Sequence, residues 1–164
     1  MIKKHWFYIV FFISIIALGS AFIAEYFFNL KPCKMCLKQR EPYYAIILGF
    51  VIFSIFKLQK KIWFYVGIQF ISIYGLFYSI WHVGIEKKIF PGPSGCSSEL
   101  KISQDITNLK EQILSKEVIN CEDVIWSIFG LSAATINSLL LFLIFIINVI
   151  YITYGFGSKK KENA

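Results

Sequence analysis

Charged side chains are scarce in this chain of 164 residues. They make up 16% of it, whereas 57% of the residues are hydrophobic, and soluble domains carry about a quarter charged residues. This scarcity excludes a disordered tail and a strongly solvated domain. Acidic residues are fewer than basic ones, 10 against 17, but the basic residues occur in short clusters between apolar runs, so no nucleic acid is expected as a partner. The composition favours a lipid bilayer around a single domain, residues 1–164.

The first long run, 6–24, contains 19 residues without a charge. About 20 apolar residues cross the hydrocarbon core of a bilayer as a helix. A cleaved signal peptide is the alternative, because Lys3, Lys4 and His5 form a basic start and small residues follow at 19–21. The uncharged run is longer than a signal core of about 7 to 15 residues. We therefore expect a first span over about 6–28.

The second apolar run, 43–56, has 14 residues and is too short to cross a bilayer by itself. The helix must then begin earlier, near residues 36–37, which gives a span over about 37–56. Ionisable residues at membrane depth indicate a functional site by default. Three of them would lie in the first turns of this helix: Lys38, Arg40 and Glu41.

Two further runs complete the expected fold, an all-α, integral membrane four-helix bundle. The third span covers about 62–81, and Gln69 in its middle is expected to make an interhelical hydrogen bond. The last uncharged run, 124–154, is longer than one bilayer requires. We expect a span over about 132–154 with Ser132 as its N-cap, and the residues before it along the interface.

The distribution of lysine indicates the orientation of the spans. Four crossings place both termini and the 57–61 loop on one side, where eight Lys and Arg residues fall within about 20 positions. The opposite side, with loops over about 29–36 and 82–131, carries nine over roughly 56 positions when Lys38 and Arg40 at the start of the second span are included. The density rule therefore predicts cytoplasmic termini and loops on the extracytoplasmic side.

All four cysteines fall in the two predicted extracytoplasmic loops, on the oxidising side of the membrane, where disulfide chemistry is expected. Cys33 and Cys36 form a Cys-x-x-Cys motif at a helix start, where the helix dipole and backbone donors lower a thiol pKa. Half of a zinc site and a plain structural disulfide are the alternatives. Zinc would usually need a second Cys-x-x-Cys or a histidine pair, so no metal is expected. Arg40 follows Cys36 by four positions and would favour its thiolate on a shared helix face.

Cys96 and Cys121 bracket a segment in which apolar residues recur at helical spacing between 102 and 113. This pattern predicts a short amphipathic interfacial helix in the second periplasmic loop. The segment is either a cap held by a structural disulfide or a mobile arm that presents an exchangeable disulfide to a soluble protein. The Pro- and Gly-rich approach at 91–95 favours an accessible position for Cys96.

The ordered set of these features resembles the disulfide bond formation protein B family, the quinone-reducing thiol oxidases of bacterial inner membranes. The resemblance covers nearly the whole chain. It includes four spans, the stretch Pro-Cys-Lys-Met-Cys-Leu-Lys-Gln-Arg at 32–40, His-Val-Gly-Ile-Glu at 82–86, the approach to Cys96, and Cys121 ahead of Gly-Leu-Ser at 130–132. Two departures are the basic Lys34 and Lys38, and Glu41 beside Arg40, which would weaken the effect on Cys36 if the two pair.

The resemblance implies a catalytic role for all four cysteines. Cys96 would be attacked by a reduced periplasmic thioredoxin-like protein (DsbA-like), Cys121 would be its disulfide partner and relay to Cys33, and Cys36 would face the membrane quinone, ubiquinone or menaquinone. Arg40 would lie beside the quinone. His82 could bind a quinone carbonyl or simply meet water at the interface.

Two other readings remain open. A non-catalytic four-span membrane protein, such as a subunit or chaperone, could hold its cysteines in two structural disulfides. The vitamin K epoxide reductase-like group is also helical with a Cys-x-x-Cys and a quinone, but the order of the motifs and Arg40 favour the first family.

Overall fold

The computed structural model describes residues 2–58, 61–93, 121–124, 126–128 and 130–162. The predicted all-α architecture is confirmed for these ranges. The helices are α1 (Ile2–Phe22), continued by a π-helical turn η1 (Ile23–Phe27), then α2 (Lys34–Lys38), α3 (Glu41–Ile55), α4 (Ile62–Glu86) and α6 (Ala133–Glu162). Cys96 and the predicted interfacial helix lie outside the described residues.

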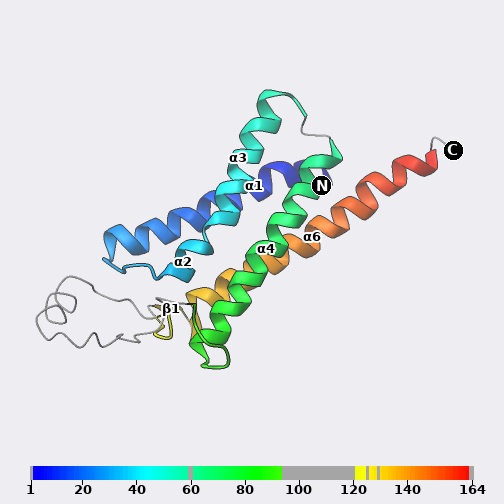
Figure 1. Cartoon of the computed structure of the whole chain (residues 1–164). Helices are drawn as coiled ribbons and strands as arrows, with labels where there is room; N and C mark the ends of the chain where they lie inside the picture. Colours follow the sequence, from blue (N-terminus) through cyan, green and yellow to red (C-terminus); the bar gives the residue numbers. More distant parts are fainter. Residues whose placement is uncertain (1, 59–60, 94–120, 125, 129, 163–164) are drawn as a thin grey trace, which may run out of the picture.

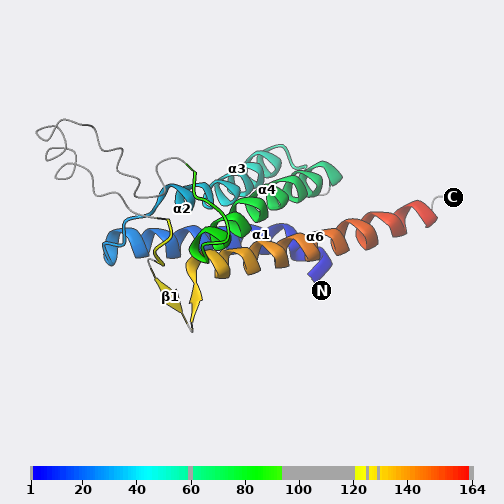
Figure 2. The same cartoon turned by 60° about the horizontal axis from the view of Figure 1, so that its bottom comes forward.

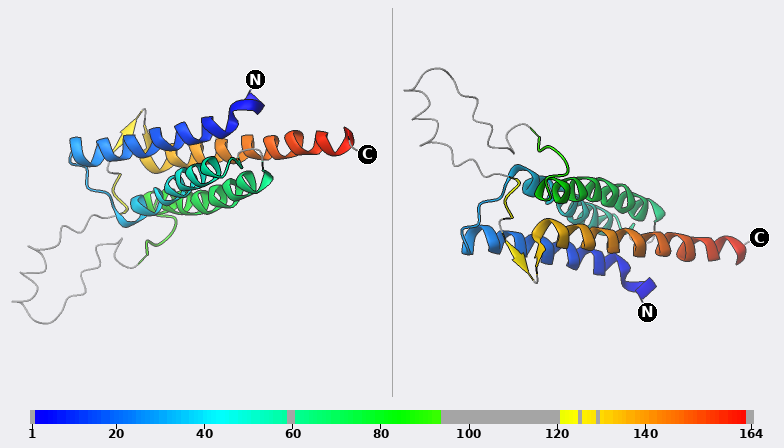
Figure 3. Two further views of the ribbon diagram at one scale, coloured as in Figure 1. Left: turned by 90° about the horizontal axis from the view of Figure 1, so that it is seen from above. Right: turned by 90° about the horizontal axis from the view of Figure 1, so that it is seen from below.

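The long helices form a bundle in which α4 packs against α6 and α3, and α1 packs against α3. The start of α1 and the end of α6 lie at the same end of the bundle (Figure 3), while α2 lies at the opposite end (Figure 1). An apolar core fills the space between the helices. Its fully buried members include Trp6, Val10, Ile46, Ile68, Leu141 and Ile144.

Within the described ranges, three helices are long and apolar enough to cross a bilayer, so the chain is a membrane protein. They cover His5–Phe27, Ile62–Glu86 and Ala133–Tyr154. Residues 37–56 do not form one continuous helix, because α2 ends at Lys38 and α3 begins at Glu41. Pro42 lies in the first turn of α3, where its missing N–H costs nothing and its ring favours a helix start. The 15 residues of α3 extend about 22 Å, less than the roughly 30 Å hydrocarbon core.

A hairpin of two short strands precedes α6. Strand β1 (Ser127–Ile128) pairs antiparallel with β2 (Leu131–Ser132), and the hairpin projects from the bundle in Figure 2. Gly130 adopts a φ of 79°, which suits a residue without a Cβ. The segment before α6, expected to lie along the interface, is thus partly a hairpin, since backbone pairing satisfies its N–H and C=O groups. The prediction for Ser132 is confirmed, because its Oγ accepts the Thr135 N–H at 3.2 Å.

Buried polar side chains join the helices inside the bundle. Asn148 of α6 is fully buried; it accepts from Trp6 Nε1 at 3.3 Å and donates to Tyr65 O and Gln69 Oε1, each at 2.8 Å. The interhelical bond predicted for Gln69 is therefore confirmed. At the other end of α4, Glu86 accepts from the Ser132 hydroxyl. The Asn148 bonds hold α4 against α6 in the first part of α4, and the Glu86–Ser132 bond holds the two helices together at the end of α4 that carries His82.

Candidate active site

The Cys-x-x-Cys motif forms the first turn of α2. Cys33 is the N-cap, and its Sγ accepts the Cys36 backbone N–H at 3.2 Å. Both residues are free thiols, and their Sγ atoms lie 2.9 Å apart, compared with about 2.05 Å in a disulfide. The pair is therefore a closely spaced dithiol. Cys33 is buried, 2% exposed, whereas Cys36 is partly exposed.

His82 approaches this dithiol from the end of α4. Its Nε2 lies 3.6 Å from Cys33 Sγ, and its Nδ1 lies 3.0 Å from the side-chain nitrogen of Gln39. Both His82 and Gln39 are buried. When the Gln39 amide donates to Nδ1, the proton of the neutral imidazole is on Nε2 and points to Cys33. The sequence pattern did not single out Gln39, although a polar residue within a short turn beside a Cys-x-x-Cys is a usable signal.

The two thiols have different acidities. The pKa of Cys33 is lowered to about 4, first by the hydrogen bond from the Cys36 thiol and then, against the opposing effect of burial, by His82 and the Cys36 backbone N–H. The same hydrogen bond, together with burial, raises the pKa of Cys36. Negative charge in the reduced pair therefore lies on Cys33, whereas the sequence reasoning favoured a thiolate on Cys36.

Arg40 is held by the first helix. Its Nη1 lies 2.5 Å from Glu25 Oε2, its Nη2 lies 3.4 Å from Ala21 O, and its guanidinium lies 5.4 Å from the centre of the Phe22 ring. The expectation that Cys36 and Arg40 share a face of one continuous helix is wrong. The helix is interrupted at residues 39–40, because α3 starts anew before Pro42.

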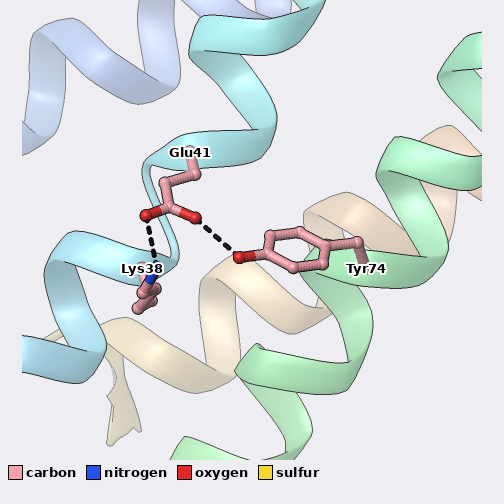
Figure 4. A network of polar contacts seen from close by, with 3 residues as sticks. All are labelled: Lys38, Glu41 and Tyr74. Atoms are coloured by element: carbon pink, nitrogen blue, oxygen red, sulfur yellow. Dashed lines mark hydrogen bonds and ion pairs between the residues drawn. The ribbon is translucent and has the colours of Figure 1, made fainter.

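Glu41 does not pair with Arg40. Figure 4 shows its carboxylate between Lys38 and Tyr74: the Lys38 Nζ lies 2.8 Å from Oε1, and the Tyr74 hydroxyl donates to Oε2 at 2.6 Å. This exposed network ties the junction of α2 and α3 to α4. Arg40 and Glu41 therefore belong to two separate ion pairs, so Glu41 does not weaken the effect of Arg40 on Cys36.

A cavity lies between the end of α1, the α2–α3 junction and the start of α6. Cys36, Gln39 and Arg40 line it, together with Tyr43, Asn137 and Trp126 and with apolar side chains of α1 and α6. Tyr43 donates to Asn137, which donates in turn to Ser79 at 2.7 Å. Cys36 and Arg40 thus meet at one mostly apolar cavity although the helix between them is broken.

Cys121 packs with the dithiol. It is fully buried and disulfide-bonded, and it belongs to a small buried cluster with Cys33, Met35 and Ile85. The two cysteine-bearing loops therefore meet here. Cys33 is a buried member of this cluster, and Cys36, which packs against the cluster, also lines the cavity.

The comparison with protein families decides the membership of the chain. The family model described as disulfide bond formation protein DsbB matches residues 3–151. The chain belongs to the DsbB family. An uncharacterized protein of Rickettsia prowazekii (strain Madrid E) is 33% identical over 131 residues, which cover 78% of this chain and 75% of the relative. No solved structure matches the chain. Membership in the DsbB family gives the protein a role in disulfide bond formation and the corresponding oxidoreductase activity.

Proposed function

We propose that this protein oxidises a periplasmic DsbA-like dithiol protein and passes the electrons to a membrane quinone, ubiquinone or menaquinone. One observation carries this proposal: Cys33 shares a buried cluster with Cys121, and Cys36, which packs against that cluster, also lines an apolar cavity together with Arg40. A relay requires such a two-sided pair. A structural disulfide would need neither the cavity nor the neighbouring second pair.

The proposed orientation places the cysteines in the periplasm and the termini in the cytoplasm of a bacterial inner membrane. The shared location of the start of α1 and the end of α6 supports an even number of crossings. In the part of the chain that the structure describes, three helices are long enough to span a bilayer. In this proposal α3, extended by the α2 turn, supplies the fourth crossing over about 37–56.

The first half of the reaction is thiol–disulfide exchange in the second loop. A thiolate of the reduced partner attacks Cys96 in a disulfide with Cys121, and Cys121 leaves as the thiolate. The partner's second thiol then displaces Cys96 and closes the partner's disulfide. Two electrons have now entered the chain.

The second half of the reaction transfers these electrons to the Cys33–Cys36 pair. The Cys121 thiolate attacks Cys33 in an oxidised Cys33–Cys36 pair, and Cys36 leaves as a thiolate. With Cys33 now in a disulfide, the negative charge moves to Cys36, at the cavity that Arg40 also lines. The guanidinium stabilises that charge. The Cys96 thiolate then attacks Cys121 in the Cys33–Cys121 disulfide, which restores the Cys96–Cys121 disulfide and releases Cys33, so the Cys33–Cys36 pair is now the reduced dithiol. Closing of the Cys33–Cys36 disulfide then gives two electrons and two protons to the acceptor.

The cavity fits a quinone head group in its chemistry. Its walls are mainly apolar, and Arg40, Tyr43 and Asn137 supply polar atoms for carbonyl oxygens. A quinone supplies a two-electron, two-proton acceptor that is soluble in the bilayer. Arg40, fixed by Glu25, holds one side of the site, and Cys36 presents its sulfur from the other.

The electrostatics of the first pair agree with this direction of electron flow. A dithiol whose thiolate is stabilised has a strongly oxidising disulfide, because its reduced form is favoured. Cys33 receives such stabilisation from the Cys36 thiol, the Cys36 N–H and His82. Electrons should therefore move from the Cys96–Cys121 pair to the Cys33–Cys36 pair.

The test is quinone reduction by the purified chain in lipid nanodiscs, driven by a reduced thioredoxin-like protein. Wild type should form quinol and oxidise the partner in equal amounts. A Cys96→Ser chain should do neither while keeping its fold. A Cys36→Ser chain that still reduces quinone at the wild-type rate would remove the assignment of Cys36.

A further inference from the structure

We propose that the reduced Cys33–Cys36 pair and His82 form a binding site for a thiophilic divalent cation such as Zn²⁺, and that an ion bound there stops electron transfer. Two thiol sulfurs and an imidazole nitrogen, one atom from each residue, lie within 4.8 Å of one another. The sequence separates His82 from the motif by 46 positions after Cys36, so spacing alone gave no sign of this set. The fold of α4 against α2 brings the three together.

The distances suit a tetrahedral zinc ion. With Zn–S near 2.3 Å and Zn–N near 2.0 to 2.1 Å, two ligands of such an ion are separated by about 3.6 Å for S and N and about 3.8 Å for S and S. The Cys33 Sγ to His82 Nε2 distance is already 3.6 Å. The two sulfurs, at 2.9 Å, need to open by roughly 0.9 Å, which a rotation of the partly exposed Cys36 side chain can supply.

The donor set determines the class of ion. Two thiolates and one imidazole favour Zn²⁺ or Cd²⁺ over Mg²⁺ and Ca²⁺, which prefer oxygen. The fourth position remains for a water molecule. Burial of Cys33 and His82 excludes competing solvent from two of the three ligands.

Gln39 supplies the outer support that histidine ligands usually have. It contacts His82 Nδ1 at 3.0 Å. A side-chain amide can present either its N–H or, after reversal, its carbonyl oxygen to that nitrogen. With the carbonyl accepting from Nδ1–H, the Nε2 lone pair faces the sulfurs and is available to a metal.

The site exists only in the reduced state. Binding replaces the protons of the dithiol with the cation and moves no electrons. Oxidation to the Cys33–Cys36 disulfide removes both sulfur ligands. The cation therefore competes with reoxidation of the pair, and this inhibitory part rests on the proposed function.

Metal binding can be measured directly with Cd²⁺ on the full chain in detergent. A Cys96→Ser/Cys121→Ser background leaves Cys33 and Cys36 as the sole thiols, reduced with a phosphine that does not bind the ion. Ultraviolet thiolate-to-Cd²⁺ absorbance should report one ion per chain, and Zn²⁺ should displace it. After oxidation of the pair the signal should vanish.

Variants identify the histidine ligand. His82→Leu should weaken Cd²⁺ binding at least tenfold, and Gln39→Leu should weaken it about tenfold. His5→Ala, which alters the only other histidine, should bind as the background chain does. Equal affinity in the His82→Leu and His5→Ala chains, or equal binding by the oxidised chain, would overturn the proposal.

Two further measurements test the site in the chain with all four cysteines: thiol protection, which does not depend on activity, and inhibition of electron transfer. In the reduced chain that retains His82, Zn²⁺ should protect the Cys33 and Cys36 thiols from alkylation, and a chelator should reverse this protection. Alkylation of these thiols at the metal-free rate would contradict the site. In nanodiscs, Zn²⁺ should halt reoxidation of the reduced pair by quinone. A chain that binds Cd²⁺ but never reduces quinone would refute the proposed function and leave the metal site standing.

Discussion

Replacement of Glu25 by Gln tests how Arg40 is held at the cavity. The side chains of Arg40 and Glu25 are 11% and 24% exposed, and their charged atoms are in contact. Breaking a fully buried pair costs about 3 to 5 kcal/mol, and an exposed pair contributes about 0 to 1 kcal/mol. The partial burial here places the cost at about 2 kcal/mol, midway between those limits.

This cost should appear mainly in quinone binding. Without the carboxylate, Arg40 can leave the cavity, and quinone binding must order it again. A loss of about 2 kcal/mol corresponds to a roughly 30-fold rise in the KM for quinone. The assay is quinone reduction in nanodiscs with reduced partner protein in excess, over a range of quinone concentrations.

The matched control is Glu41→Gln. It removes the other ion pair of the same junction, whose Lys38 and Glu41 side chains are 47% and 45% exposed. An exposed pair of this kind is screened by water, so the KM should change less than about fivefold. A Glu25→Gln chain with the wild-type KM, or two variants with equal increases, would refute the assignment of Arg40.

Two further changes test other parts of the structure. His82→Leu removes a stabilising contact of the Cys33 thiolate, so the Cys33 pKa should rise by about 1 to 2 units and the reduction potential of the pair should fall by roughly 30 to 60 mV. In wild type the stability that this thiolate contributes is complete above the unfolded pKa near 8.5 and is lost as the pH falls toward 4; in the variant it should be lost at a higher pH. NMR of isotope-labelled cysteine and redox titration measure these changes, and an unchanged titration would contradict the role of His82. Gly75→Ala would place a Cβ 2.7 Å from the Pro42 ring, and should destabilise the bundle by about 1 to 3 kcal/mol, whereas Gly67→Ala in the same helix meets nothing within 4 Å and should be neutral or slightly stabilising in thermal unfolding.

Features set by local chemistry could be predicted from the sequence. The start of α4 at Ile62 and the cap at Ser132 follow from hydrophobic pattern and a hydroxyl before a helix. The interhelical bond of Gln69 follows from the cost of an unpaired amide in lipid. Each of these depends on a few neighbouring residues.

Features that depend on tertiary contacts could not be predicted. The length argument required one helix through residues 37–56, but Pro42 starts a new helix and Arg40 turns toward Glu25 of the first helix. The meeting of His82, Gln39 and Cys33 joins segments that are 43 to 49 positions apart. No spacing rule relates such segments before the packing of α4 is known.

The most direct test of the central claim is single-turnover transfer from the second cysteine pair to the first. A Cys96→Ser chain with a reduced Cys121 and an oxidised Cys33–Cys36 pair should form a Cys33–Cys121 disulfide, because Cys96 is no longer present to displace Cys33. Alkylation of the released Cys36 thiolate traps this bond, which is read by mass spectrometry of peptides. Formation of this bond, together with quinol production in the wild-type chain alone, is the predicted result. Quinol production by a Cys121→Ser chain at the wild-type rate would show that electrons do not follow this path.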